Sequence, residues 1–255
     1  MDDVSARGRF VWYDLLTPDP KRAEPFYTAV AGWGKETWNG PMPYTMWTAG
    51  GTTIGGVMGM PPNAEAPPHW LAYVSVPDVD ASVTQAQSLG GRTLKPATDI
   101  PTVGRFAVLA DPQGAEFALF TPAGTPPSHD APPGLGEFSW HELLTTDYKS
   151  AFQFYQALFG WEMLQEHDMG PMGIYAIFGR DGARLGGMFN KTADMPIPPN
   201  WLQYIRVDDA DRVAAVVEAN GGTVINGPMD VPGGDRIAQC LDPGGAMFAV
   251  HALKA

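Results

Sequence analysis

Cysteine is nearly absent from this 255-residue chain: Cys240 is the only one, so no disulfide can form within it. A lone thiol fits a reducing compartment, and we expect a cytoplasmic protein. No apolar run approaches the roughly 18 residues that a membrane-spanning helix requires. The first ten residues, MDDVSARGRF, lack the apolar segment of a secretory signal peptide. We therefore expect neither a membrane protein nor a disulfide-stabilised secreted one.

Positive charge is also scarce. Lys and Arg number 16 against 28 Asp and Glu, which gives a formal net charge of −12. Without a basic run, binding to the phosphate backbone of nucleic acids is disfavoured. The chain also lacks the phosphate loop G-x-x-x-x-G-K-[ST], the C-x-x-C pair of zinc sites and the G-x-S-x-G turn of serine hydrolases. A small-molecule ligand is the expected partner, rather than nucleic acid or membrane.

Glycine, proline and aromatic residues are abundant. The 30 Gly and 25 Pro would interrupt long helices, which argues against an all-helical bundle. The 8 Trp, 12 Phe and 8 Tyr argue against a disordered chain. Frequent turns and ordinary packed cores are expected.

The two halves of the chain repeat each other. Residues 8–33, GRFVWYDLLTPDPKRAEPFYTAVAGW, match residues 136–161, GEFSWHELLTTDYKSAFQFYQALFGW, at 14 of 26 positions. A Pro- and Gly-rich stretch without apolar periodicity lies between the halves and reads as a linker. We predict two tandem domains, residues 8–121 and 136–253, with a linker over residues 122–135. Shorter motifs recur too: IGG at 54–56 as LGG at 185–187, and DPQG at 111–114 as DPGG at 242–245.

Each repeat contains two successive units with one order of elements, β-α-β-β-β. Residues 10–17 are dense in aromatic and aliphatic side chains, as in a strand. Residues 21–30 carry apolar side chains at i, i+3, i+4 and i+7, as on one face of a helix. Asp80 is the predicted cap of the second helix. In the third unit, only two strands are visible after the helix, at 175–178 and 184–188.

One helix for every four strands leaves one sheet face uncovered in each unit. Two units can bury these faces by curling around a shared space. We predict an α+β fold in which the paired units of each repeat form a half-open barrel with a cavity. Such cavities are common small-molecule sites.

Three motifs carry a resemblance to a known family: LLT-x-D-x(3)-A-x(2)-FY-x(4)-GW, the IGG/LGG pair and D-P-x-G-x(2)-F. Together they resemble the vicinal oxygen chelate superfamily of glyoxalases, bleomycin-resistance proteins and extradiol dioxygenases, in a tandem two-domain form. The resemblance implies a small-molecule-binding protein of the glyoxalase/bleomycin-resistance type, with degenerate or metal-free catalysis. Two alternatives stay open: a metal-dependent lyase or dioxygenase/hydroxylase acting in the second domain, and a protein-interaction scaffold. Monomer and homodimer are both open.

Enzymes of that superfamily hold a divalent metal with His, Gln and Glu ligands from the first and last strands of each unit. The matching positions here hold Trp12 or Tyr13, Ala118, Trp140 or His141, Gln203 and Ala249. Alanine cannot bind a metal, so His141 is named as the candidate ligand, joined by Gln203 only if the register of its strand suits. We expect no tightly bound cofactor, and at most weak divalent metal binding in the second domain.

Asp14 and Glu142 are carboxylates at equivalent places in the predicted first strands. Burying an unpaired carboxylate is costly, so each either faces the cavity or meets a cation. Arg105 and Arg236, which are also equivalent to each other, are candidate partners. We name Asp14 and Glu142 as candidate catalytic bases, and leave a purely structural ion pair open.

Aromatic walls suit flat or apolar ligands, although aromatic side chains also simply fill cores. The remaining histidines are expected to be structural, because His69 and His251 have no carboxylate or histidine partner at useful spacing. The candidate substrate-binding residues are Trp12, Tyr13, Trp47, Tyr73, Arg105, Trp140, His141, Tyr204 and Arg236.

Overall fold

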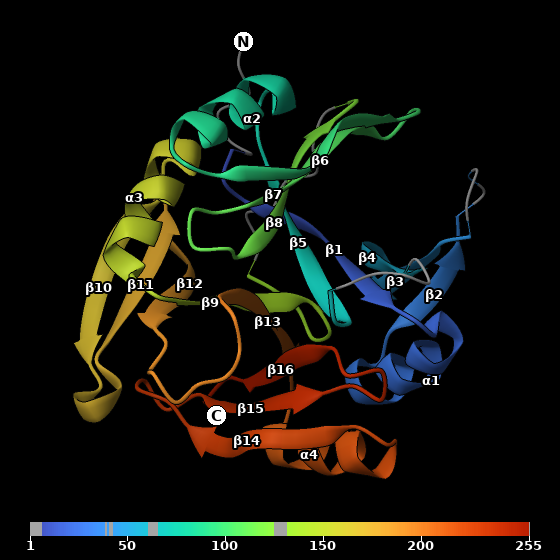
Figure 1. Ribbon diagram of the computed structural model, residues 1–255. Helices are drawn as coiled ribbons and strands as arrows, with labels where there is room; N and C mark the ends of the chain where they lie inside the picture. Colours follow the sequence, from blue (N-terminus) through green and yellow to red (C-terminus); the bar gives the residue numbers. More distant parts are fainter. Residues whose placement is uncertain (1–6, 39, 41–42, 61–65, 125–131, 255) are drawn as a thin grey trace. The chain divides into compact units, whose positions relative to one another are not determined.

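A computed structural model describes residues 7–38, 40, 43–60, 66–124 and 132–254 (Figure 1). Part of the predicted linker, residues 125–131, lies outside them. The described residues form two eight-stranded sheets and four α-helices, which confirms the predicted α+β fold. No described helix is long and apolar enough to cross a membrane.

The elements of the first repeat follow the predicted order. They are β1 (Phe10–Thr17), α1 (Pro20–Ala31), β2 (Gly34–Thr37), β3 (Thr45–Ala49), β4 (Thr52–Gly59), β5 (His69–Ser75), α2 (Val79–Ser88), β6 (Arg92–Ile100), β7 (Gly104–Ala110) and β8 (Glu116–Pro122).

The second repeat adds one short 3-10 helix to the same plan. Its elements are β9 (Phe138–Thr145), α3 (Tyr148–Phe159), β10 (Glu162–Asp168), η1 (Gly170–Met172), β11 (Ile174–Arg180), β12 (Ala183–Asn190), β13 (Asn200–Val207), α4 (Ala210–Ala219), β14 (Thr223–Asp230), β15 (Arg236–Leu241) and β16 (Met247–Ala252).

Each sheet takes its strands from one repeat. The strand orders are β2-β3-β4-β1-β5-β8-β7-β6 and β10-β11-β12-β9-β13-β16-β15-β14, so corresponding strands hold corresponding places. The first strand of a unit pairs in parallel with its last, as β1 does with β4. The sheets are open rather than closed barrels, in agreement with the predicted half-open form.

Two differences from the sequence prediction concern strands at the sheet edges. β10 was missed, because its residues EMLQEHD are mostly exposed and show no regular apolar alternation. β6 and β14 are longer than their apolar segments and run through Pro96 and Pro228. Both are edge strands, where proline is tolerated because one side of the backbone needs no partner.

Each α-helix begins at an aspartate whose side chain accepts a hydrogen bond from a backbone N–H of the first turn. For α2 this residue is Asp78, not the predicted Asp80, which lies within the first turn. The glycine after α1, Gly32, adopts the left-handed conformation with φ of 70°, as expected for a C-cap. The four capping residues are Asp19, Asp78, Asp147 and Asp209.

The compact units of the structure do not coincide with the repeats. Of the described residues, unit 1 combines those within 7–11, 72–124 and 141–201, and unit 2 combines those within 12–60, 66–71, 132–140 and 202–254. Each unit therefore joins one βαβββ unit of the first repeat to one of the second. The division into residues 8–121 and 136–253 follows the sheets, whereas the backbone is most densely gathered within these two units.

A tryptophan in each unit ties one repeat to the first strand of the other. In unit 2, Trp33 donates a 2.6 Å hydrogen bond to the carbonyl of Gly136. In unit 1, its counterpart Trp161 donates a 2.7 Å bond to the carbonyl of Gly8. Gly8 and Gly136 have φ of 78° and 82°, a conformation that favours glycine. The repeated G-x-F and GW motifs thus serve packing between repeats.

Candidate functional site

The candidate carboxylates lie on the sheet face away from the helices. In unit 2, Trp47 pairs with Gly55, which pairs with Tyr13, and Trp47 packs 5.9 Å from the ring of Tyr27 on α1. The next row of the ladder contains Gly56 and Asp14. Because successive residues of a strand point to opposite faces, Asp14 points away from α1.

A tyrosine and a tryptophan hold the Asp14 carboxylate. Its Oδ1 accepts hydrogen bonds from the Tyr44 hydroxyl at 2.6 Å and from the Trp12 indole Nε1 at 3.1 Å. Trp12 Nε1 also lies 2.8 Å from the Tyr44 hydroxyl oxygen. Burial, followed by the charge of Asp14, raises the pKa of Tyr44 far above its ordinary value. The phenol therefore stays protonated and acts as a donor.

The second repeat builds the same pair in unit 1. The Tyr175 hydroxyl donates a 2.9 Å hydrogen bond to Oε2 of Glu142. Gly187 pairs with Glu142 in the β12–β9 ladder, as Gly56 pairs with Asp14. The same arrangement thus occurs twice in the chain: a tyrosine hydroxyl bonds to an Asp carboxylate in the first repeat and to a Glu carboxylate in the second.

The glycine pairs make room for these sites. A Cβ on Gly56 would overlap the ring of Tyr44, and one on Gly187 would overlap the ring of Tyr175. A Cβ on the preceding glycine, Gly55, would overlap the carbonyl of Tyr13 on the neighbouring strand. The first glycine of each pair therefore permits close strand pairing, and the second admits the tyrosine.

His141 lies in a packed core, not with Glu142. It shares a row with Phe178, which stacks on Trp161 at 4.4 Å, so it faces the helix side of its sheet. Its ring stacks on Phe10 at 3.6 Å, and Nδ1 lies 2.8 Å from the carbonyl of Leu185. Burial lowers the pKa of His141 to about 4, although the bond to Leu185 opposes this. A neutral imidazole donating to Leu185 results.

The described residues do not fit a divalent metal of the kind that the fold family uses. They contain no group of three or more His, Cys, Asp or Glu side chains arranged to hold one. The last-strand positions are the fully buried Ala118 and Ala249, which have no donor atom. Glu142 points to the face opposite to His141. Gln203, in unit 2, is fully buried, and within the described part of the chain neither amide atom has a hydrogen-bond partner.

Two more of the candidate aromatic residues are core residues of unit 2. Tyr13 stacks on Phe138 at 3.8 Å and is 6% exposed. Trp47 is fully buried among aromatic rings, and its indole Nε1 has no hydrogen-bond partner among the described residues. Neither lies on the face that carries Asp14.

The other candidate aromatic residues are buried or half-buried. Trp12 bonds to Asp14, as described above, and Tyr73 lies 6.0 Å from the ring of Phe106. Tyr204 belongs to a buried cluster with three other residues, and its hydroxyl accepts a hydrogen bond from Gln239 at 3.0 Å. This cluster is Leu202, Tyr204, Ile237 and Ala249, with the half-buried Trp140, Met229, Val231 and Met247 packed against it.

The expectation that the two arginines pair with Asp14 and Glu142 was wrong. Arg105 binds Asp80 at 2.7 Å and Asp99 at 2.8 Å. Arg236 makes the equivalent pairs with Asp211 and Asp230. Each arginine side chain projects toward the helix that precedes its strand, and therefore meets an aspartate on that helix. These exposed pairs fasten a helix to the sheet edge.

A buried chain of hydrogen-bonded side chains in each unit was not predicted from the sequence. In unit 2, Trp70 Nε1 donates to the Tyr27 hydroxyl at 2.9 Å, and Tyr27 donates to Oδ2 of Asp242 at 3.2 Å. In unit 1, Trp201, Tyr155 and Asp111 form the equivalent chain. The aspartate comes from the D-P-x-G turn, which is the one signal that could have indicated it.

His251 was wrongly expected to lack a polar partner. Its Nε2 lies 3.1 Å from Oδ2 of Asp235, and its Nδ1 lies 2.9 Å from Oγ of Ser139. Sequence spacing could not show this, because Ser139 is 112 residues away on β9. Asp235 lies in the turn between β14 and β15, 16 residues from His251.

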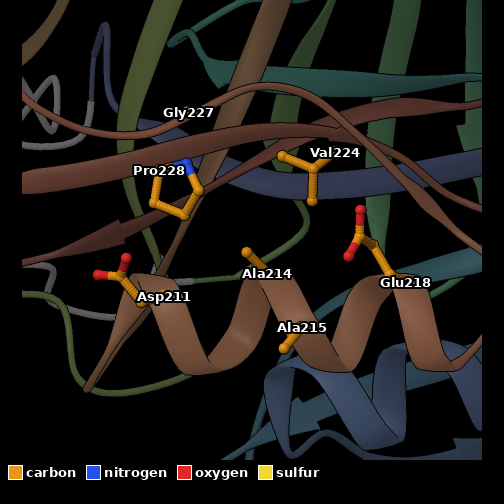
Figure 2. Close-up of a pocket in the computed structure, with 7 residues that line it drawn as sticks. All are labelled: Asp211, Ala214, Ala215, Glu218, Val224, Gly227 and Pro228. Carbon is orange, nitrogen blue, oxygen red and sulfur yellow. The ribbon is translucent and has the colours of Figure 1, made fainter.

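Two surface grooves lie in unit 2. The larger, of about 380 Å³, runs between α4 and β14 and has carboxylates of Asp211 and Glu218 along its helix side (Figure 2). The smaller, of about 240 Å³, includes Arg236 and Lys254 in its lining. Asp14, Glu142 and the candidate aromatic residues line neither groove. The predicted cavity beside Trp12 and Trp140 stays a prediction.

Both repeats of the chain are similar to known protein families. Residues 137–250 match the Glyoxalase/Bleomycin resistance protein/Dioxygenase superfamily, and residues 11–120 match the Glyoxalase-like domain. CFP32 of Mycobacterium tuberculosis, provisionally named a glyoxylase, is 36% identical over 247 residues, covering 94% of this chain and 92% of CFP32. The anthracycline biosynthesis protein DnrV of Streptomyces peucetius is 29% identical over 265 residues, covering 98% and 94%.

Solved structures show the same fold at low sequence identity. A homoprotocatechuate 2,3-dioxygenase of Brevibacterium fuscum superposes with a TM-score of 0.70 and 13% identity, over all of this chain and 84% of that one. The Mn(II)-bound glyoxalase of Novosphingobium aromaticivorans has a TM-score of 0.65 and 17% identity, over 97% and 82%. With both repeats matched and a relative similar along nearly its whole length, the chain belongs to the glyoxalase/bleomycin resistance protein/dioxygenase superfamily.

Proposed function

We propose that the protein binds a small aromatic molecule on the sheet faces that carry Asp14 and Glu142. In this proposal, each carboxylate accepts a hydrogen bond or a proton from a ligand hydroxyl, without a metal. The single observation that carries the proposal is the twice-built carboxylate–tyrosine pair, Asp14 with Tyr44 and Glu142 with Tyr175.

The chemistry of each pair suits a hydroxylated ligand. An ionised carboxylate only accepts hydrogen bonds, whereas a protonated phenol can donate one and accept another. Because each tyrosine gives its one O–H to the carboxylate, the pair offers a ligand hydroxyl the acceptor oxygens of that carboxylate and no further donor. Trp12, which bonds to both Asp14 and Tyr44, adds a flat apolar surface beside them.

The relatives support a small-molecule ligand of this kind. Two of them are named as anthracycline biosynthesis proteins, and anthracyclines are hydroxylated polycyclic aromatic compounds. The dioxygenases and the glyoxalase among the structural neighbours support the fold alone, because their identity is below 20%. Their metal chemistry is not carried over to this chain.

The test is a titration with an anthracycline aglycone, followed by quenching of the intrinsic fluorescence of the 8 tryptophans. Saturable quenching is expected, together with a rise in melting temperature, because a ligand that binds only the folded state stabilises it. Asp14→Asn and Glu142→Gln keep the size of each side chain but remove its charge, and each should weaken binding at its own site about tenfold. The control Asp99→Asn removes a carboxylate charge that is exposed and paired with Arg105, so the affinity measured by quenching should stay unchanged. A titration without saturable quenching would refute the proposal.

A further inference from the structure

A serine, a histidine and an aspartate form one hydrogen-bonded chain in unit 2. Ser139 Oγ on β9 lies 2.9 Å from Nδ1 of His251 on β16, and Nε2 of His251 lies 3.1 Å from Oδ2 of Asp235. The His251 side chain is 12% exposed and that of Asp235 is 33% exposed. The three groups are therefore close to solvent but partly shielded from it.

Asp235 fixes the tautomer of the imidazole. The desolvation of Asp235 is outweighed by hydrogen bonds from the backbone N–H of Lys254 and from His251, which lower its pKa. Asp235 is thus a carboxylate that accepts the Nε2–H of His251. A neutral imidazole has one donor and one acceptor nitrogen, so Nδ1 is left as the acceptor facing Ser139. The competing acceptor of the serine hydroxyl, the carbonyl of Tyr204, is farther away at 3.4 Å.

The aspartate is held in place by its surroundings. Its Oδ1 accepts the backbone N–H of Lys254 at 2.9 Å. Its carbonyl accepts the N–H of Val231 at 2.9 Å, and the carbonyl of Val231 accepts the N–H of Gly234 at the same distance. A fixed third group that orients the base is the recurring feature of activated serines, whatever the fold.

Apolar surface adjoins the chain of polar groups. Ile237 is the register partner of His251 and belongs to the buried cluster described above. Trp140, which follows Ser139 along β9, and Val231, at the start of the Asp235 turn, are half-buried and pack against that cluster. The surroundings of Ser139 therefore best suit a substrate whose acyl group is small and apolar.

The first repeat does not carry these residues. At the positions equivalent to Ser139, Asp235 and His251 it has Val11, Gly104 and Phe120. The two repeats share their carboxylate–tyrosine pairs but differ at these three positions. The fold therefore does not require the hydrogen-bonded set of Ser139, His251 and Asp235. This set is a feature of the second repeat alone.

We propose that Ser139 is a nucleophile, activated by His251 and positioned by Asp235, that takes the acyl group of small apolar aryl esters. Oγ attacks the ester carbonyl carbon while its proton passes to Nδ1. The C–O bond to the phenolate breaks, and the phenolate takes the proton from Nδ1. Water then attacks the acyl carbon and gives a proton to Nδ1. The Oγ–C bond breaks, the carboxylic acid leaves, and Oγ regains the proton.

The test is labelling of the intact protein with a short-chain alkyl fluorophosphonate, followed by mass spectrometry. Attack by Ser139 Oγ on phosphorus would displace fluoride and add one alkylphosphonyl group per chain. We expect this label on the tryptic peptide that contains Ser139, and the same protein should release p-nitrophenol from p-nitrophenyl butyrate. An unlabelled protein, or a label on another residue, would overturn the proposal without any variant.

Variants assign the roles. Ser139→Ala should abolish labelling, and His251→Ala should slow it about 100-fold, the usual contribution of a general base. Asp235→Asn should slow it by about 10²- to 10⁴-fold with an unchanged melting temperature, because an asparagine favours the wrong tautomer of the imidazole, and Asp235→Glu should restore part of the rate. Ser88→Ala, at an exposed serine on α2, is the matched control that should label normally. Unchanged labelling in His251→Ala would show that the histidine does not activate the serine.

Discussion

Tyr44 donates a 2.6 Å hydrogen bond to the buried carboxylate of Asp14. This is the distance typical of an O–H group bonded to an anion, a bond about twice as strong as one between neutral groups. The counterpart in the second repeat, Tyr175 to Glu142, is longer at 2.9 Å. The pair in the first repeat therefore depends more strongly on its hydroxyl group.

Tyr44→Phe should lower the free energy of unfolding by about 1–3 kcal/mol, because it removes one donor from a buried carboxylate. Tyr175→Phe should cost less, in keeping with its longer bond. Urea unfolding followed by circular dichroism measures both. Equal and negligible effects would show that water replaces the phenol and that the pairs are not tightly held.

The second glycine of each pair can be tested on one strand. Gly56→Ala should destabilise by about 1–3 kcal/mol, because the new Cβ would overlap the Tyr44 ring and force it from Asp14. Gly59→Ala, on the same strand, is the control: its Cβ would meet no atom within 4 Å, so a change below about 1 kcal/mol is expected. Thermal or urea unfolding of the two variants gives the comparison. A tolerated Gly56→Ala would mean that Tyr44 can move freely.

Much of the fold could be predicted from the sequence because the same order of strands and helices occurs in both repeats. The strand at residues 10–17 and the helix at 21–30 were predicted within one residue at either end. β10 carries little apolar patterning of its own, yet its counterpart β2 stands at the same place in the first repeat. Alignment of the second repeat with the first would have predicted β10, which local apolar patterning alone does not.

The compact units could not be predicted, because repetition shows which segments are alike and not which ones pack together. The hydrogen bond from Trp33 to Gly136 joins residues 103 positions apart. The two motifs that it connects were recognised, but nothing in their spacing indicates a contact.

The candidate site was predictable where one strand supplies the groups. Asp14 and Glu142 were identified from their unusual place in apolar strands, and the structure gives each a tyrosine partner. His141 was named as a candidate ligand because it stands at the first-strand position that the resembling metalloenzymes use, and its neighbour Glu142 was not counted as a second ligand. Adjacent residues of a strand point to opposite faces, so adjacency in sequence separates them.

The buried chain of Trp70, Tyr27 and Asp242 yields a third prediction. Tyr27→Phe would leave the Trp70 indole N–H and Oδ2 of Asp242 without this partner in a fully buried place, at a cost of about 2–4 kcal/mol. Tyr148→Phe is the control: its hydroxyl bonds to the exposed Glu166, so water can take its place and less than about 1 kcal/mol is expected. Unfolding in guanidinium measures both. Similar losses would contradict the polar chain.

His141 makes the stability of the protein depend on pH in a defined direction. Its pKa is about 4 in the folded protein against an ordinary value of 6.5, because burial disfavours the charged ring. Between these pH values the unfolded state binds more protons, so this contribution is fully present above pH 6.5 and is lost as pH falls toward 4. The full difference corresponds to roughly 3 kcal/mol.

His141→Phe removes the titrating ring and keeps an aromatic partner for Phe10. The variant should lose less stability than the wild type when pH falls from 7.5 to 4.5, although loss of the donor to Leu185 makes it less stable at pH 7.5. The readout is the difference between the two pH profiles of urea unfolding, because the carboxylates common to both proteins cancel. Phe10→Leu removes the stacking partner but leaves the titrating ring, so its profile should shift downward and stay parallel to that of the wild type. Parallel profiles for wild type and His141→Phe would instead mean that protonation of His141 does not differ between the folded and unfolded states, and that the ring is not enclosed as its 3.6 Å stacking on Phe10 requires.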